Sequence, residues 1–280
     1  MIDRFLEQKV DILKENLGLT RTEAKREVYI LAAFALGVDR LDLIKNPELI
    51  SQKITSTKFV EYFEQRSKGR PIPYIKGQCE FFSLNFKLND AVLCPRPETE
   101  LLVEEAIRLA KEYQFTRILE LGVGSGIVSI SIAKNVSDIE IHGCDVSHAA
   151  LFVANLNADN LTDSKNINFF ESDWYSNVEG VYDLIVSNPP YIKEKDPHLK
   201  APGVSFEPLE ALVSGTEGLD ALRHIISHSK SYLSERGWLL FEHGYDQADA
   251  CRKLLSRNGF GSIFTSKDLS GKRRVSGGRI

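Results

Sequence analysis

Apolar positions in the first seventy residues recur at helical spacing. One stripe precedes Gly18 and consists of Phe5, Val10, Leu13 and Leu17. The stretch from Thr20 to Glu23 is a capping-box pattern, because a hydroxyl residue stands three positions before a glutamate at the start of an apolar run. Two shorter helical patterns follow, at 39–45 and 56–68. This region is therefore predicted to be a small all-α bundle, and its local sequence gives no role beyond packing.

The pattern changes at residue 71. Prolines and a glycine interrupt short alternating runs, of which Phe82 to Leu88 is the clearest. Asn89 and Asp90 are residues that favour turns. Residues 71–96 are therefore predicted to form a β-hairpin linker.

From residue 97 onward, apolar strands alternate with amphipathic helices. Strands are expected at 117–121, 140–145, 167–172, 183–187, 238–242, 262–265 and 274–279. Helices are expected at 98–113, 127–135, 149–160, 219–234 and 248–257. This alternation predicts an α/β domain with a mainly parallel, doubly wound sheet. We expect three parts: 1–70, 71–96 and 97–280.

Composition and charge limit the classes of protein to which the chain can belong. The 280 residues are 42% hydrophobic and carry a net charge of −4, which argues against a general nucleic-acid coat but leaves a local contact open. The four cysteines are far apart and show no zinc-site or disulfide-framework spacing, so no metal is expected. The charged start Met1–Phe5 does not resemble a signal peptide, and the longest apolar run, Tyr29–Val38, is too short to span a membrane. A soluble, cytoplasmic protein is expected.

A glycine-rich loop, Glu120 to Gly126, lies where a predicted strand ends and a helix begins. Glycines there let the backbone turn tightly and approach a ligand. The spacing misses the dinucleotide fingerprint by one position, and no Gly-Lys-Ser/Thr follows as a P-loop would require. Glu120 would repel a pyrophosphate and suits a cationic ligand, while Asp145 after the next strand is placed to hold ribose hydroxyls. The combination indicates S-adenosylmethionine, with a dinucleotide as the alternative.

Asp173 and Trp174 follow the third strand, at the same edge of the predicted sheet. An indole can stack on adenine, and a carboxylate can accept a hydrogen bond from its amino group. A tryptophan that simply covers a strand end against the core is the alternative.

The tetrapeptide Asn188-Pro189-Pro190-Tyr191 follows the fourth strand and is the most informative motif. The lone pair of a planar amide nitrogen is delocalised, which makes it a poor nucleophile. The Asn188 side-chain oxygen and the Pro189 carbonyl could accept both N–H hydrogens and direct the lone pair at a methyl donor. The prolines hold the backbone rigid, and Tyr191 could form an aromatic wall. A plain Pro-Pro turn is the alternative; with the glycine loop, the motif favours an N-methyltransferase.

Several further motifs extend the pattern over nearly the whole chain. They are Arg70–Gly77 with Phe81, Leu93–Glu100, Phe206–Pro208 with Ala211-Leu212 and Gly218–Asp220, Glu242 with Gly244 and Gln247, and Asp268 with Gly271 and Arg274. With these motifs, the chain resembles the HemK/PrmC-type peptide chain release factor glutamine methyltransferases. Cys94, Val123 and Ser214 depart from the usual residues of that family, without removing a chemical group that the reaction needs.

The resemblance implies a seven-stranded, Rossmann-like class I methyltransferase domain behind an N-terminal helical domain that grips the substrate. It implies methyl transfer from S-adenosyl-L-methionine to the side-chain amide of the glutamine in the Gly-Gly-Gln motif of class I release factors, which affects translation termination. Nucleic acid and membrane are not required, and a monomer is expected. The candidate cofactor residues are Glu120, Gly122, Val123, Gly124, Ser125, Gly126, Asp145, Asp173, Trp174 and Asn188. The candidate substrate residues are Asn188, Pro189, Pro190 and Tyr191, of which Asn188, Pro189 and Tyr191 are the catalytic candidates.

Two other functions are compatible with parts of the pattern. N6-adenine methylation of a nucleic acid uses the same tetrapeptide chemistry, but it needs a basic target-recognition region that this chain does not suggest. A non-catalytic binding module could keep the cofactor fold, although the intact glycine loop and Asn188 argue against it.

Overall fold

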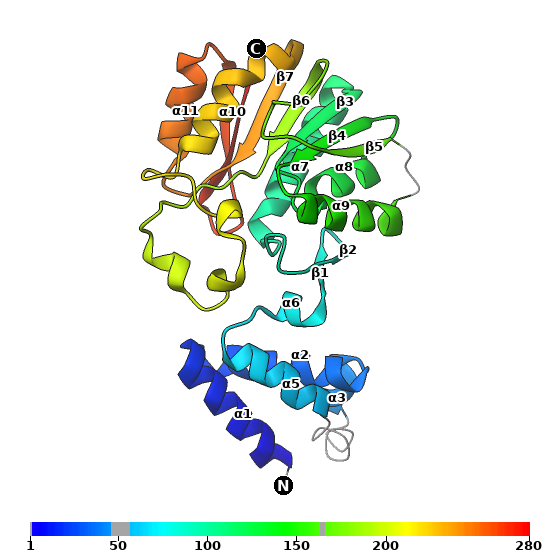
Figure 1. Cartoon of the computed structure of the whole chain (residues 1–280), viewed down its shortest axis with the longest axis vertical. Helices are drawn as coiled ribbons and strands as arrows, with labels where there is room; N and C mark the ends of the chain where they lie inside the picture. The colour runs from blue at the N-terminus through cyan, green and yellow to red at the C-terminus, as the bar shows by residue number, and fades with distance from the viewer. Residues whose placement is uncertain (1, 46–56, 163–165) are drawn as a thin grey trace. The chain divides into compact units, whose positions relative to one another are not determined.

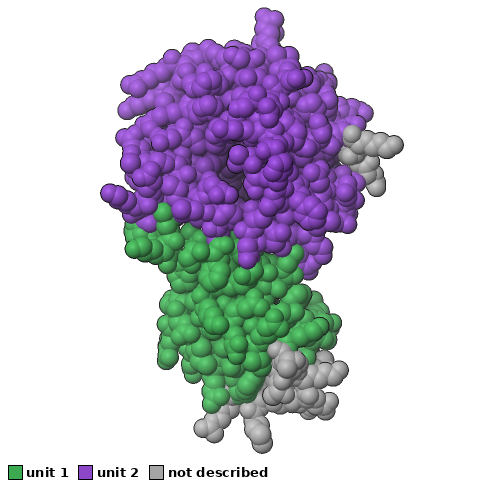
Figure 2. Space-filling model, viewed as in Figure 1, with its two compact units in different colours: residues 1–77, 197–206 green, residues 78–196, 207–280 purple. Residues whose placement is uncertain are grey.

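The computed structural model describes residues 2–45, 57–162 and 166–280 (Figure 1). The chain divides into two compact units (Figure 2). Unit 1 contains Met1–Gly77 and Pro197–Phe206, and unit 2 contains Gln78–Asp196 and Glu207–Ile280. None of the helices described in these ranges is both long enough and apolar enough to cross a membrane.

Unit 1 is built from helices, as predicted. They are α1 (Ile2–Leu17), α2 (Arg21–Leu36), α3 (Arg40–Lys45), α5 (Thr57–Ser67) and α6 (Ile72–Lys76). The capping box is present: the Thr20 side chain accepts a hydrogen bond from the Glu23 amide at 3.3 Å, and the Glu23 carboxylate accepts from the Thr20 amide at 2.9 Å. Position 56, where the second short pattern begins, lies outside the described residues.

The core of unit 1 lies among α1, α2 and α5. Its fully buried members include Leu13, Val28, Leu31, Leu43 and Phe59. The nearly buried Arg66 pairs with Glu27 at 2.7 Å, and its Nη1 donates to the carbonyls of Gly69 and Arg70. Arg66 therefore fixes the path of the chain where α5 ends.

A segment distant in sequence completes unit 1. Residues 197–206 contain two 3-10 turns, η2 (Pro197–Lys200) and η3 (Val204–Phe206). A Cβ placed on Gly69 would lie 3.4 Å from the Phe206 ring, and one on Gly203 would lie 3.8 Å from Pro71. The chain thus leaves unit 2 after Asp196 and re-enters it at Glu207.

Unit 2 contains the predicted seven-stranded sheet, in the order β5-β4-β3-β6-β7-β9-β8 (Figure 1). The strands are β3 (Arg117–Leu121), β4 (Glu140–Asp145), β5 (Ile167–Glu171), β6 (Tyr182–Ser187), β7 (Leu233–Glu242), β8 (Gly261–Lys267) and β9 (Arg273–Arg279). The first five are parallel, whereas β9 runs antiparallel between β7 and β8. The chain order reverses between β3 and β6, and ligands of doubly wound sheets bind at such a switch point.

Helices cover both faces of this sheet. They are α7 (Glu100–Tyr113), α8 (Ile127–Asn135), α9 (His148–Leu161), α10 (Asp220–His228) and α11 (Ala248–Arg257). Ile118 packs in one core cluster with residues of α7 and α8, while the next residue, Leu119, packs in the other with residues of α10 and α11. The alternation places apolar side chains on both faces, which confirms the doubly wound architecture.

One local prediction was incomplete and another was wrong. The linker contains a hairpin of β1 (Gln78–Phe81) and β2 (Leu84–Lys87), and Asn89-Asp90 lie in a turn after it, where the Val92 amide donates to the Asn89 carbonyl at 3.4 Å. The hairpin itself turns at Phe82-Ser83, both with positive φ. The Phe82 amide donates to Glu100 of α7 at 2.9 Å, so a tertiary contact holds a turn that the local sequence does not favour. The helix expected at 219–234 ends at His228, and a 3-10 turn, η5 (Ser229–Tyr232), leads into a strand that begins earlier than predicted.

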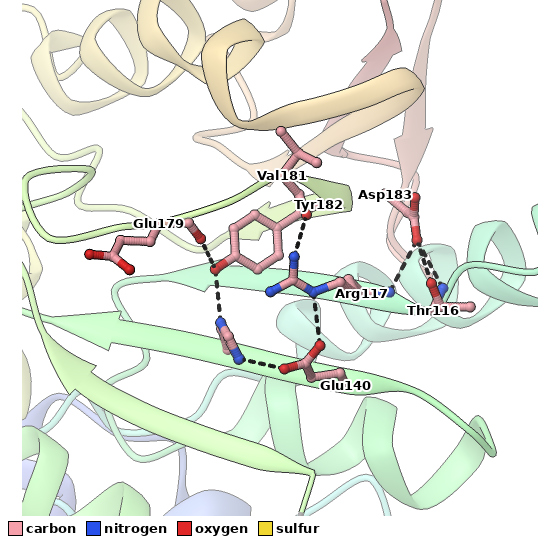
Figure 3. Close-up of polar contacts among 8 residues, drawn as sticks. Thr116, Arg117, Glu140, Glu179, Val181, Tyr182 and Asp183 are labelled. Carbon is pink, nitrogen blue, oxygen red and sulfur yellow. Dashed lines mark hydrogen bonds and ion pairs between the residues drawn. The ribbon is translucent and has the colours of Figure 1, made fainter.

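A polar network joins the amino-terminal ends of β3, β4 and β6 (Figure 3). Asp183 accepts hydrogen bonds from the amides of Thr116 and Arg117 at 2.9 and 3.1 Å. Arg117 donates to Glu140 at 2.8 Å and lies over the Tyr182 ring, 4.9 Å from its centroid. Charged side chains at this edge therefore connect neighbouring strands.

Candidate active site

A cavity lies at the opposite, carboxyl-terminal edge of the sheet, within unit 2. Eleven of the predicted site residues line it: Glu120, Gly122, Val123, Gly124, Ser125, Asp145, Asp173, Trp174, Asn188, Pro189 and Pro190. The two predicted residues that are not part of its lining are Gly126 and Tyr191. The ends of β3, β4, β5 and β6 thus meet at one cavity, as the sheet topology requires.

The glycine loop is held open along the cavity. The amides of Gly122 and Val123 donate to the Cys144 carbonyl at 2.8 and 3.1 Å, which ties the loop to β4. A Cβ on Gly122 or Gly124 would meet no atom within 4 Å, so both glycines face open space. A Cβ on Gly126, in contrast, would lie 3.0 Å from Ile130 and 3.4 Å from α9, so this glycine allows close helix packing. The first two glycines leave room for a ligand.

Asn157 supports this loop from behind. The side chain is fully buried on α9 and donates to the carbonyls of Ser125 and Lys87, while it accepts from the Lys87 amide at 2.7 Å. All these groups belong to unit 2. One buried amide therefore connects the cavity wall to the hairpin.

Asp145 presents a fixed carboxylate to the cavity. One oxygen accepts from the Gly124 amide at 2.9 Å and the other from the Ser147 amide at 2.9 Å. Each carboxylate oxygen can accept a further hydrogen bond. The arrangement can receive a pair of neighbouring hydroxyls, as on a ribose.

Glu120 is the buried acid of the site. It is 1% exposed and accepts hydrogen bonds from the Ser129 amide, at 2.9 Å, and from the Ser129 hydroxyl. Burial raises its pKa to about 8, although the bonds from Ser129 act to lower it. A cationic ligand in the cavity would favour the ionised carboxylate.

Trp174 adopts a conformation that tryptophan rarely takes. Its φ is 51°, and its carbonyl accepts hydrogen bonds from Ser172 and from the Cys144 thiol. A left-handed conformation of a non-glycine residue costs on the order of 1–3 kcal/mol. The fold therefore holds the indole at the cavity in spite of this strain.

The tetrapeptide is anchored on three sides. The Ser187 hydroxyl donates to the Leu121 carbonyl at 2.7 Å, and Asn188 Nδ2 donates to Thr99 Oγ1 at 3.3 Å. The Tyr191 hydroxyl donates to Glu242 Oε1 at 3.1 Å, and the Tyr191 carbonyl accepts from Gln247. Burial raises the pKa of Tyr191 above its ordinary value. The Tyr191 side chain is thus engaged beside the cavity and is not part of the lining.

Other lining residues had no assigned role in the sequence. They include Arg96, Thr99, Pro208, Glu210 and Ala211. Arg96 Nη2 lies 2.7 Å from both carboxylate oxygens of the nearly buried Glu207, which joins two segments far apart in sequence. In the sequence, only the family resemblance of these segments could have indicated that they line the site, because their local pattern is that of proline-rich loops.

The residues present fit S-adenosylmethionine. Glu120 suits a ligand that carries a positive charge, and Asp145 suits one that carries ribose hydroxyls. The open space beside Gly122 and Gly124 lets such a ligand approach the backbone closely. Among the residues that the structure describes, no group of three or more His, Cys, Asp or Glu side chains could hold a metal ion.

Comparisons with known proteins agree with this geometry. Residues 97–202 match the family model "Methyltransferase small domain", and residues 12–77 match "PrmC N-terminal domain". Two relatives are called "Release factor glutamine methyltransferase". The protein from Coxiella burnetii is 39% identical over 94% of both chains, and that from Burkholderia pseudomallei is 40% identical over 90% of both.

Solved structures support the fold alone. The hMettl16 catalytic domain, solved with an RNA hairpin, gives a TM-score of 0.56 at 15% identity, covering 78% of this chain and 81% of that one. A methyltransferase from Pyrococcus furiosus gives a TM-score of 0.51 at 15% identity, covering 71% and 89%.

Proposed function

The chain belongs to the release factor glutamine methyltransferases, and we propose that the cavity of unit 2 is where it methylates the glutamine of its substrate. It is an S-adenosylmethionine-dependent methyltransferase that modifies the side-chain N5 of the glutamine in the Gly-Gly-Gln motif of peptide chain release factors. The adenine-methylating alternative is not favoured by these relatives. The observation that carries the assignment of the site is the meeting of Asn188 with the glycine loop and Asp145 at one cavity.

Different residues of the cavity would bind different parts of S-adenosylmethionine. Asp145 would hold the ribose hydroxyls, Trp174 would stack on the adenine, and the ionised Glu120 would favour the positively charged end. Gly122 and Gly124 give the backbone a close approach. When bound, S-adenosylmethionine supplies an electrophilic methyl group on a sulfonium. Val123, Ser125 and Asp173 line the cavity, and their contacts with the cofactor remain predictions. Gly126 is not part of the lining, and the space around it favours a role in helix packing.

Asn188 and Pro189 prepare the substrate nitrogen. The Asn188 side-chain oxygen and the Pro189 carbonyl each accept one N–H of the glutamine amide, which directs the nitrogen lone pair at the methyl carbon. The same acceptors stabilise positive charge as it develops on the nitrogen. The methylated amide then loses one proton to water. Pro190 lines the cavity and would contact the substrate, whereas Tyr191, bound to Glu242 and Gln247 beside the cavity, would hold this corner in place.

The remaining assignments concern the rest of the chain. We propose that residues 1–70 recognise the release factor, that 71–96 link the parts, and that 97–280 carry the reaction. The protein is proposed to act as a cytoplasmic monomer on class I release factors, without a nucleic acid. Light scattering on a sizing column tests the monomer, and methylation of an isolated release factor tests the need for nucleic acid.

One assay tests the function. The purified protein is incubated with S-adenosylmethionine carrying a labelled methyl group and with a purified class I release factor, and the modified peptide is identified by mass spectrometry. Label is expected on the glutamine of Gly-Gly-Gln and absent from a release factor in which alanine replaces that glutamine. Label on duplex DNA or RNA, and none on the release factor, would contradict the proposal.

A further inference from the structure

Ser172 lines the cavity, and neither the sequence motifs nor the reaction chemistry assigns it a role. We propose that Ser172 is a positioning residue, which fixes the direction of the Trp174 indole and joins the groups that bind the adenine and the ribose of the cofactor. This inference rests on the proposed function, in which Trp174 stacks on the adenine and Asp145 holds the ribose.

The direction in which the Trp174 side chain leaves the backbone depends on the two peptide groups that flank its Cα. A tryptophan with a φ of 51° points differently from one in an ordinary conformation. For a residue with a Cβ, the ordinary conformations are lower in free energy. Contacts must therefore hold both peptide groups if the indole is to stay at the cavity.

Hydrogen bonds hold both of these peptide groups. The carbonyl before the Trp174 Cα belongs to Asp173 and accepts from the Ser176 amide at 3.1 Å and from the Ser176 hydroxyl at 2.7 Å. The carbonyl after it belongs to Trp174 and accepts from the Ser172 hydroxyl at 2.9 Å and from the Cys144 thiol at 3.3 Å. Burial raises the pKa of Cys144 to about 12, so the thiol keeps the proton that it donates. The conformation of Trp174 is thus fixed from both sides.

The direction of the hydrogen bond from the Ser172 hydroxyl is also fixed. The hydroxyl accepts from the Asn177 amide at 2.9 Å, and a backbone amide can only donate. The single proton of the hydroxyl is therefore available to the Trp174 carbonyl, which can only accept. Ser172 is 2% exposed, so bulk water does not compete for either bond.

Ser172 also contacts the residue that would hold the ribose. The Ser172 amide donates to the Asp145 carbonyl at 3.1 Å. The carboxylate of Asp145 lines the cavity, where it accepts from the amides of Gly124 and Ser147. The backbone of Ser172 is thus bound to the end of β4, and its side chain is bound to Trp174. One residue therefore sets the position of the adenine-binding group relative to the ribose-binding group.

The affinity for S-adenosylmethionine, measured by calorimetry, tests the inference. Ser172→Ala removes a donor to the Trp174 carbonyl and is expected to raise the Kd about fivefold, the size of one neutral hydrogen bond. Adenosine, which carries only the nucleoside part of the cofactor, should lose affinity by the same factor. Ser172→Thr, which keeps the hydroxyl, should restore most of the affinity.

A double-mutant cycle separates positioning from a purely structural role. In a Trp174→Ala background, Ser172→Ala is expected to change the Kd less than twofold, because no indole remains to be positioned. In steady-state assays of Ser172→Ala, the KM for S-adenosylmethionine should rise while kcat at saturating cofactor stays within twofold. Ser229→Ala is the matched control: it removes a fully buried hydroxyl that donates to the Ile226 carbonyl at 3.0 Å, and it should lower stability without changing the Kd.

Fluorine NMR can observe the indole directly. The chain contains two tryptophans, so protein labelled with a fluorinated tryptophan gives two resonances, and that of the buried Trp238 is the internal reference. In the wild type, S-adenosylmethionine is expected to shift the Trp174 resonance alone. In Ser172→Ala without ligand, this resonance should broaden or split, because the indole takes more than one orientation. Cys144→Ala, which removes the second donor, should give the same change if Ser172→Ala folds poorly.

Three results would overturn the inference. They are an unchanged Kd in Ser172→Ala, an equal rise in the Kd with and without the indole, and a Trp174 resonance that S-adenosylmethionine does not shift. Failure of the proposed function gives a different result, because binding is measured without methyl transfer. A protein that binds S-adenosylmethionine but leaves the release factor unmethylated would refute that function and not the role of Ser172.

Discussion

The two ends of the parallel strands hold their polar side chains in opposite ways. At the amino-terminal edge, Asp183 accepts hydrogen bonds from the backbone amides of Thr116 and Arg117 (Figure 3). It also accepts one from the Ser234 hydroxyl, and its pKa is lowered. At the carboxyl-terminal edge, Glu120 and Glu242 are buried with raised pKa values, and Trp174 is held in a strained conformation. The first edge stabilises the fold, whereas the second keeps functional groups at a cost in stability.

We expect the largest effect from a substitution that removes most of the methylation activity and leaves the fold intact. Asn188→Ala should lower the methylation rate by about 10²–10³, the loss typical of one well-placed transition-state hydrogen bond. Thermal unfolding should change little, because among the residues that the structure describes this side chain makes one hydrogen bond, a long one to Thr99. Rate and melting temperature measured on the same preparation check this; a variant with full activity would contradict the proposed site.

Asp145→Ala should weaken cofactor binding. Loss of a charged acceptor is worth about 1.5–3 kcal/mol, so we expect the Kd for S-adenosylmethionine to rise between tenfold and a hundredfold. Calorimetry measures this directly. Asp159→Ala, an exposed acid on α9, is the matched control and should leave the Kd unchanged.

Glu242→Gln should stabilise the fold above neutral pH. The folded pKa of about 7 lies above the ordinary value of 4.5, so the ionised carboxyl destabilises the protein as pH rises through that window. The variant should be more stable than the wild type at pH 8 by on the order of 1–3 kcal/mol. The advantage should vanish below pH 4.5. Urea unfolding at the two pH values measures it, and an equal advantage at both would exclude ionisation as the cause.

Asp183→Ala, at the amino-terminal edge of the sheet, should destabilise the fold at neutral pH. Burial acts to raise the pKa of Asp183, but hydrogen bonds from Thr116, Ser234 and Arg117 lower it below 3.8. Its contribution is therefore present above pH 3.8 and lost as pH falls further. We expect a loss of about 1–2 kcal/mol at pH 7. Activity per folded molecule should be unchanged. A selective loss of activity would contradict the view that the amino-terminal edge serves stability and not the reaction.

Glu140→Gln should have the smallest effect. The Arg117–Glu140 pair is partly exposed on both sides, at 35% and 48%, and exposed pairs contribute at most about 1 kcal/mol. Unfolding measured at low and high salt should show a small difference that salt removes. A large, salt-insensitive loss would mean that this edge behaves like a buried network.

The sequence predicted the sheet well where local pattern and tertiary context agree. The bounds of β3, β4 and α8 match at both ends, because apolar runs there end at glycines, an aspartate or polar helix ends. The turn at Phe82-Ser83 could not be found, since Glu100 holds it from a distant helix. The glycine loop and the tetrapeptide predicted eight of the 26 residues that line the cavity, because both motifs follow strands whose pattern is clear in the sequence.

The rest of the site depends on contacts between distant segments. Asn188 contacts Thr99, which ends a 3-10 turn, and Tyr191 contacts Glu242, which ends a strand, so these segments meet only in the folded chain. The inclusion of residues 197–206 in unit 1 likewise has no local signal, because its partners are around Gly69 and Pro71. Spacing along the sequence carries no information on such meetings.

The chain crosses between its two units at three places, after Gly77, after Asp196 and before Glu207. Residues 1–77 are therefore not a complete structural unit that can be exchanged alone. A chimera that exchanges only residues 1–77 would leave 197–206 without the surface on which it packs. Evolution of a new binding preference in this part would require coordinated change in two stretches of the gene that lie far apart.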